Sequence, residues 1–130
     1  MVNKAKAKGT AAETRVVNFL LTAGVKANRV VMKGQKDEGD IHIIDGHGCV
    51  SCVLEVKAGK QTAQVSRQQL EDWIEEARIE GDNFGMSRAA LVIAKHGSSV
   101  KDYQVWTVEG PPRRCLFYLD EFAEFAKGGF

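Results

Sequence analysis

Two short apolar runs joined by turn residues constrain the fold of this chain more than any other feature. The first run, residues 41–44, follows Gly39-Asp40, and the second, residues 49–54, leads into Glu55-Val56-Lys57. Between them lies Asp45-Gly46-His47-Gly48, a sequence rich in turn-forming residues. Apolar runs separated by such a turn predict a β-hairpin.

The charged side chains at the end of this hairpin indicate a cation site. Strand side chains alternate with period two, so Glu55 and Lys57 should project from one face. The hairpin should bring Asp40 opposite residues 53–55, within reach of the same face. Ionised groups at the end of an apolar hairpin cost free energy unless something compensates them. A divalent cation with oxygen ligands, Mg²⁺ or Mn²⁺, would do so.

The first 36 residues predict a basic tail, a helix and a strand. Residues 1–8 are expected to be a flexible tail, and the pattern Thr-x-x-Glu at Thr10 and Glu13 is typical of a helix start. Apolar residues at helical spacing continue from there to Gly24. Residues 29–33 then predict a strand.

The second half of the chain predicts a helix, two strands and a final helix. Ser66 and Gln69 repeat the capping pattern, and apolar residues at helical spacing follow to about Glu80. The apolar run 89–94 predicts a strand covered on both sides, and residues 103–108 predict another. We expect the acidic face of the 66–80 helix to stay away from phosphates; its members are Glu71, Asp72, Glu75 and Glu76.

The order α-β-β-β-α-β-β-α predicts an α/β fold with a mixed five-stranded sheet flanked by helices. The crossover from Lys57 through the second helix to residue 89 makes those two strands parallel. The chain has 130 residues, of which 44% are hydrophobic and 27% charged. This size and composition predict a single globular domain over residues 9–130.

Charge distribution and cysteine content indicate the cellular compartment of the protein and the kind of partner it binds. Residues 1–36 carry eight Lys or Arg and one acid, whereas residues 37–130 carry ten basic and sixteen acidic residues. This asymmetry is typical of a surface that meets a polyanion, although a solvated basic tail would give the same count. No apolar run reaches the length of a membrane span. Three cysteines leave an odd thiol, which indicates a reducing, cytoplasmic location.

Four segments together resemble the PD-(D/E)XK nuclease superfamily, and within it the archaeal-type Holliday junction resolvases. They are Lys8-Gly9-Thr10-Ala11-Ala12-Glu13, Gly39-Asp40-Ile41, Leu54-Glu55-Val56-Lys57 and Val65-Ser66-Arg67-Gln68-Gln69. The resemblance implies a restriction-endonuclease-like core and metal-dependent hydrolysis of DNA phosphodiesters. One departure is Gly39, which stands where the superfamily often has Pro.

The resemblance also implies roles for particular residues. Asp40 and Glu55 would hold Mg²⁺ or Mn²⁺ with the carbonyl of Val56, and Glu13 would complete the metal shell. Lys57 would orient the attacking water and counter charge at the phosphorus. Gln69 would help to position water or Lys57. For Glu13 and Gln69, a helix-capping role is an alternative that the sequence leaves open.

The expected partner is a four-way DNA junction, bound through its phosphates and cut by a homodimer with two matched centres. The C-terminal half, with Trp106, Phe122, Phe125 and Phe130, would supply the dimer interface. The residues expected to contact DNA are Lys4, Lys6, Lys8, Arg15, Lys33, Lys36, Lys60 and Arg67.

Three other functions remain open from the sequence. The same core could serve another DNA nuclease of nicking, flap-cutting, exonuclease or restriction type. It could also form a non-catalytic DNA-binding protein, which the presence of Asp40, Glu55 and Lys57 disfavours. A protein-interaction module is the third alternative, and it would show neither metal dependence nor nucleic-acid affinity.

Overall fold

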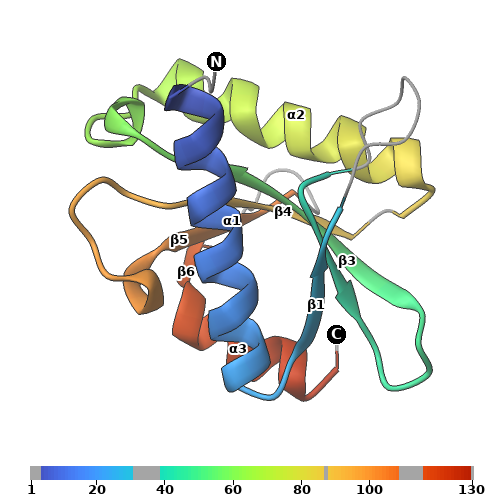
Figure 1. The fold of residues 1–130 in the computed structure, drawn as a ribbon. Coiled ribbons are helices and arrows are strands. Elements are labelled where there is room, and N and C mark those ends of the chain that lie inside the picture. The colour runs from blue at the N-terminus through green and yellow to red at the C-terminus, as the bar shows by residue number, and fades with distance from the viewer. Residues whose placement is uncertain (1–3, 31–38, 87, 109–115, 130) are drawn as a thin grey trace.

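The computed structural model describes residues 4–30, 39–86, 88–108 and 116–129 of the chain (Figure 1). Two 3-10 turns, η1 (Lys60–Thr62) and η2 (Val100–Asp102), lie between its helices and strands. Those elements are, in order, α1 (Lys4–Thr22), β1 (Lys26–Arg29), β2 (Ile41–Ile44), β3 (Val50–Lys57), α2 (Arg67–Phe84), β4 (Ala89–Ile93), β5 (Gln104–Thr107), β6 (Leu116–Tyr118) and α3 (Leu119–Lys127).

One mixed sheet organises the described residues. Its strand order is β1-β2-β3-β4-β5-β6, and all neighbours are antiparallel except β3 and β4, which are parallel. The predicted hairpin and the predicted parallel crossover are therefore confirmed. The sheet has six strands where the sequence predicts five, because the three residues of β6 pair with β5 at the edge. A run so short has too few residues to show a strand period.

Helices cover both faces of this sheet. On one face, α1 and α3 pack against alternate strand residues, and the core includes Val16, Leu20 and Phe122 together with Leu54 and Val92. Figure 1 shows α1 crossing in front of the sheet and α2 running along its upper side. The second core, on the opposite face, lies beneath α2 and is made of Trp73, Ile74, Ala77, Leu91 and Ile93.

The first helix and the first strand begin earlier than the sequence predicts. Helix α1 starts at Lys4, so residues 4–8 are helical and Thr10 is not a cap; the Thr10 carbonyl instead accepts a hydrogen bond from Thr14 Oγ1 at 3.0 Å. The alternating Lys and Ala residues before Gly9 are strong helix formers, which explains the longer helix. Strand β1 spans Lys26–Arg29 because Val25 and Ala27 face the core. Residues 1–3 and 31–38 lie outside the described residues.

The later elements follow the sequence more closely. Ser66 caps α2 by accepting a hydrogen bond from the Gln69 N–H at 3.1 Å, as predicted. The helix runs beyond Glu80 to Phe84 and ends at Gly85, whose φ of 85° is the left-handed conformation of a helix C-cap. All five residues of β4 are buried, as the apolar run predicts. Helix α3 also lies where its periodicity predicts.

Candidate active site

Asp40 directly precedes β2, at the end of the hairpin where β3 continues beyond its last pair with β2. The Asp40 N–H donates to the Leu54 carbonyl at 2.9 Å, and Ile41 pairs with Leu54 in the ladder. One residue pair further along β3, the Val56 N–H donates to Asp40 Oδ2 at 2.7 Å. The Asp40 carboxylate thus takes the position of a strand partner at the rim of the sheet, beside Glu55 and Lys57.

Gly39 explains how the chain enters this position. Its φ is 94°, in the left-handed region, and a Cβ atom there would lie 2.4 Å from Val53 Cγ1. Both the backbone conformation and the space therefore require glycine. Gly39 is accordingly part of how Asp40 is placed.

Glu55 is the most deeply buried acid of the predicted set, with 5% of its surface exposed. Its carboxyl group is in hydrogen-bonding contact with Asp40 and with Glu80. Burial, these hydrogen bonds and the negative charges of both neighbours all raise the pKa of Glu55 far above its ordinary value. Carboxyl groups this close repel one another unless they share protons or bind a cation.

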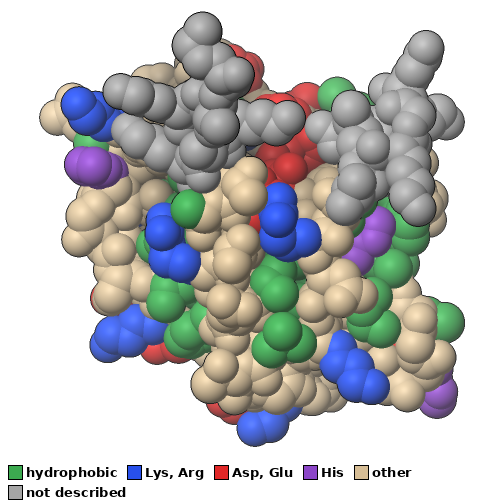
Figure 2. Space-filling model, viewed as in Figure 1, with side chains coloured by type: hydrophobic (Ala, Val, Ile, Leu, Met, Phe, Trp, Pro, Cys, Tyr) green, Lys and Arg blue, Asp and Glu red, His purple; other side chains and the backbone are tan. Residues whose placement is uncertain are grey.

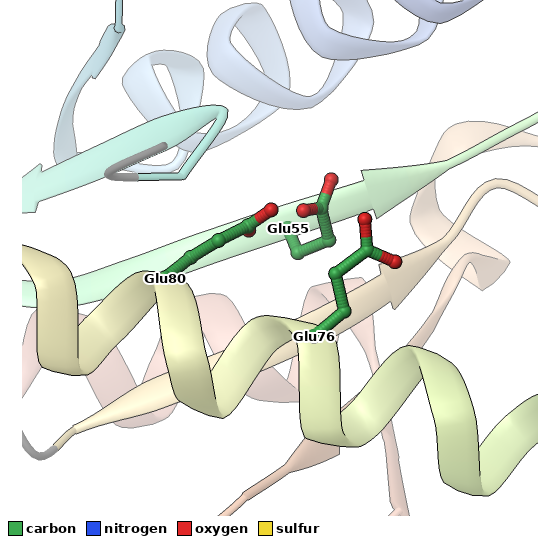
Figure 3. A group of neighbouring side chains, drawn as sticks. All are labelled: Glu55, Glu76 and Glu80. Carbon is green, nitrogen blue, oxygen red and sulfur yellow. The ribbon is translucent and has the colours of Figure 1, made fainter. Parts of the chain in front are cut away.

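Two acids of this site come from α2, and the sequence interpretation missed both. Glu76 and Glu80 point towards Glu55 from the helix that crosses over β3, as Figure 3 shows, and one oxygen from each of the three lies within 4.8 Å of the others. The sequence places Glu76 only on the acidic face of this helix, whereas the structure turns its carboxylate towards Glu55 and Lys57. The helical period contained a signal, since Glu76 and Glu80 follow the buried Trp73 by three and seven residues.

Lys57 points to the same face as Glu55, as predicted. Its Nζ atom lies 2.8 Å from Glu76 Oε2 and 5.9 Å from the centre of the Trp73 ring. Burial lowers the pKa of Lys57, but the hydrogen bond to Glu76 and the charges of Glu55, Glu76 and Glu80 outweigh it, so the pKa is raised. Lys57 is therefore an ammonium ion at neutral pH.

Glu13 reaches the same rim from α1, on the other face of the sheet. Its Oε1 atom lies 3.5 Å from Arg29 Nε. Burial and the negative charge of Asp40 raise the pKa of Glu13, and Arg29 opposes them only in part. Asp40 thus lies beside Glu55, Lys57 shares the strand face of Glu55, and Glu13 lies within the electrostatic influence of Asp40.

Gln69 stands apart from these four residues. It lies in the first turn of α2, its side chain is exposed, and its backbone N–H serves the Ser66 cap. Seven residues, about two helical turns or 10 Å, separate it from Glu76. This geometry favours the capping role over a catalytic one.

The donor set at the rim suits a hard divalent cation. One carboxylate oxygen each from Glu55, Glu76 and Glu80 lies within 4.8 Å of the others, and Asp40 lies beside Glu55. Such oxygens are the ligands that Mg²⁺ and Mn²⁺ prefer. A bound cation would also relieve the repulsion that raises the pKa of Glu55. The residues therefore fit a metal of this class.

Basic residues lie on the same side of the molecule as the acids. Figure 2 shows acidic side chains near the upper edge of this face, with Lys and Arg side chains below them and to the left. Lys60 is exposed in η1, between β3 and α2, and Arg67 is exposed at the first position of α2. Lys4, Lys6 and Lys8 belong to α1, whereas Lys33 and Lys36 lie outside the described residues.

A cavity of about 410 Å³ lies against the loops that follow β3 and β4. Arg15, Lys95 and His96 line it, and none of its described lining residues is acidic. Arg15 Nε donates to the Tyr103 hydroxyl at 3.0 Å, which fixes the guanidinium at this cavity. Lys95 and His96 were not predicted, because a turn after an apolar strand carries no signal of its own.

The fold is similar to that of Hjc from Archaeoglobus fulgidus, a Holliday junction resolvase of an archaeal hyperthermophile. The two chains are 23% identical, the TM-score is 0.51, and the match covers 91% of this chain and 99% of that one. The predicted resemblance is thereby confirmed for the fold, which is restriction-endonuclease-like. No protein-family model and no curated protein matches the sequence.

Proposed function

We propose that this chain is a metal-dependent DNA endonuclease of the PD-(D/E)XK superfamily that resolves four-way junctions. One observation carries the proposal: Asp40, Glu55, Lys57 and Glu13 meet at one rim of a sheet with the fold of a resolvase. Sequence spacing and the family resemblance single out the same four residues without any geometry. Their convergence supports that interpretation, because residues 13, 40 and 55 are far apart along the chain.

Asp40 and Glu55 are the proposed ligands of Mg²⁺ or Mn²⁺, with the Val56 carbonyl and Glu13 completing the shell. The Val56 peptide already contacts Asp40 through its N–H group, at 2.7 Å. When bound, the cation would neutralise phosphoryl oxygens and lower the pKa of a water molecule.

The remaining chemistry belongs to side chains of the protein. The Lys57 ammonium would orient the attacking water and balance charge that develops on the phosphoryl group. Its raised pKa keeps it protonated for this task. Gln69 is given no part in the proposed chemistry, because it lies at the Ser66 cap, about two helical turns from Glu76.

Backbone phosphates would contact the basic residues around the rim. The proposed contacts are those predicted from the sequence, extended by the cavity beside the β3 and β4 loops with Arg15, Lys95 and His96. Such contacts recognise charge and shape and carry little information on base sequence. They suit a nuclease that selects the structure of its DNA.

Two matched incisions in a junction require two centres, so a homodimer is part of the proposal. The predicted interface needs one correction: Phe122 is buried in the core against α1 and cannot also face a partner. Phe130 lies outside the described residues, and Trp106 packs partly against the core under α2. The apolar residues exposed in this region are Leu116, Tyr118 and Phe125.

A cleavage assay tests the proposal. Purified protein is incubated with a synthetic four-way junction, a flap, a nicked duplex, a linear duplex and single strands, with and without Mg²⁺. We expect metal-dependent, paired incisions in the junction. Asp40→Asn should abolish cleavage and weaken metal binding, whereas Lys57→Ala should abolish cleavage and leave metal binding largely intact. Preference for flaps or free ends would instead favour another nuclease of this fold, and no cleavage of any substrate would contradict the proposal.

A further inference from the structure

The partner of Lys57 in this structure is a residue that the catalytic motif does not contain. Its ammonium lies 2.8 Å from Glu76 Oε2, and Glu76 comes from α2, nineteen positions away in the sequence. The motif residues Glu55 and Lys57 share a strand face, but their spacing in the sequence does not show which other residues contact them. What holds the end of the Lys57 side chain is therefore decided by the helix above it.

We propose that Glu76 is a positioning residue, which holds the Lys57 ammonium in place for the reaction. This inference rests on the proposed function, since it concerns the task assigned there to Lys57. A lysine side chain has a flexible four-carbon stem and loses much rotamer freedom when it is held in one place. If the Lys57 ammonium is already held in place before substrate binds, this loss of freedom does not add to the barrier of the reaction.

The surroundings of Lys57 support an anchoring role over a surface ion pair. The Lys57 side chain is 20% exposed and that of Glu76 is 44% exposed. Glu76 therefore contacts the Lys57 ammonium from the side that faces solvent. On its inner side lies the Trp73 ring, 5.9 Å from Nζ, within the range of a cation–π contact. Trp73 and Glu76 are three residues apart on α2 and therefore share one helix face.

The arrangement also separates two tasks among the acids. Glu55 and Glu80 are buried, at 5% and 2% exposure, and their carboxyl groups contact one another. Glu76 is the acid whose carboxylate is bonded to the ammonium. The proposal therefore assigns Glu76 to Lys57, while Glu55 remains a proposed ligand of the cation.

Single-turnover cleavage of a junction at increasing Mg²⁺ gives the first test. Glu76→Gln keeps the size of the side chain and removes its charge. We expect the rate at saturating Mg²⁺ to fall about ten- to a hundredfold, while the Mg²⁺ concentration for half-maximal rate and the affinity for DNA stay within about twofold. Glu76→Asp should recover part of the rate. The control is Glu75→Gln, which removes an exposed acid paired with Arg78 on the same helix.

Two results in this assay would overturn the inference. An unchanged rate in Glu76→Gln would show that Lys57 needs no anchor. A large rise in the Mg²⁺ requirement, with the full rate restored at high Mg²⁺, would make Glu76 a metal ligand instead. If the unaltered protein cleaves no DNA, the proposed function itself fails. The contact between Glu76 and Lys57 can then still be tested by fluorescence, as described next.

The second measurement needs neither metal nor DNA. In a Trp106→Phe background, Trp73 is the remaining tryptophan, and its emission reports the charge near its ring. We expect Glu76→Gln to change this emission and Glu75→Gln to leave it unchanged. In a Lys57→Ala background, Glu76→Gln should have a clearly smaller effect, because the part of the effect that acts through Lys57 is lost. Equal effects with and without Lys57 would contradict the inference.

Discussion

Gly39 is a single residue on which the placement of Asp40 depends. Its φ is positive, and a Cβ atom at this position would lie only 2.4 Å from Val53 Cγ1, which leaves no room for another side chain. We expect Gly39→Ala to lower the free energy of unfolding by about 1–3 kcal/mol and to reduce cleavage strongly. Thermal unfolding and the junction assay measure the two effects.

Gly48 provides the matched control for that substitution. It also has a positive φ, 80°, but a Cβ atom there would meet nothing within 4 Å. Gly48→Ala should therefore cost only the backbone strain and leave cleavage nearly unchanged. Equal losses of activity in the two variants would show that Gly39 has no special part in positioning Asp40.

The raised pKa of Glu55 makes the stability of the metal-free protein depend on pH. The folded state keeps the Glu55 proton longer than the unfolded chain does, so stability should fall as pH rises above the unfolded pKa of about 4.5. We expect Glu55→Gln to remove part of this loss, raising stability at pH 8 by at least about 1 kcal/mol and much less at pH 4. Cleavage should be abolished. Denaturant unfolding at both pH values, in the presence of a chelator, measures the difference.

Mg²⁺ offers an independent check of the same residue. Added Mg²⁺ should stabilise the unaltered protein at pH 8 and have little effect on Glu55→Gln, because the variant lacks a proposed ligand. Stability that is independent of pH between 4 and 8 in the metal-free protein would contradict the burial of an ionisable Glu55 beside two other acids.

At the scale of elements, the loops after β3 and β4 form one basic edge. Because these strands are parallel, their carboxyl ends lie together, and the Ala94 N–H donates to the Lys57 carbonyl at 2.8 Å. Thr62, which is buried, ties the two loops: its Oγ1 donates to the Gly59 carbonyl at 2.7 Å and accepts from the His96 N–H at 2.8 Å. Lys95 is therefore held next to the proposed catalytic rim.

Lys95→Ala should weaken DNA binding without changing the chemistry. We expect the slope of log affinity against log salt concentration to decrease by about one, as the loss of one phosphate contact predicts. The maximal cleavage rate should stay within about twofold. Fluorescence anisotropy across a salt series measures the slope. Lys101→Ala is the control, because Lys101 is exposed in η2 and does not line the cavity; the same change in both variants would exclude a specific contact.

At the scale of the whole molecule, the β6 end of the sheet exposes apolar side chains among the described residues. Leu116, Tyr118 and Phe125 are 45%, 47% and 58% exposed, and they lie on β6, the edge strand, and on α3. None of the helices in the described part of the chain has the length and apolar character of a membrane span. The proposed occupant of this apolar surface is a second copy of the chain.

Light scattering at micromolar concentration should therefore give the mass of a dimer. Phe125→Asp should give a monomer that is still folded, because Phe125 is more than half exposed and its ring contact with Phe117 is a minor part of the core. Such a monomer should no longer make paired incisions in a junction but should still nick one strand. A monomeric mass for the unaltered protein would contradict the dimer.

Local patterns determined most of the elements and the centre of the site. Alternation along residues 41–57 predicted the hairpin, so Asp40, Glu55 and Lys57 were identified together, and the apolar run at 89–94 predicted a buried parallel strand. These features depend on neighbours in the chain or on one crossover, which sequence spacing records directly. The start of α1 was missed because helix propensity before Gly9 outweighed the capping pattern at Thr10.

Contacts between distant elements were decided only by the tertiary structure. Glu76 and Glu80 join the site because α2 packs across β3, and the rotation of a helix about its axis is set by its packing core. The cavity with Lys95 and His96 exists because two loops meet at the ends of parallel strands. A helix face records which residues are neighbours on that helix, whereas the residues it meets on the sheet depend on how the whole chain packs.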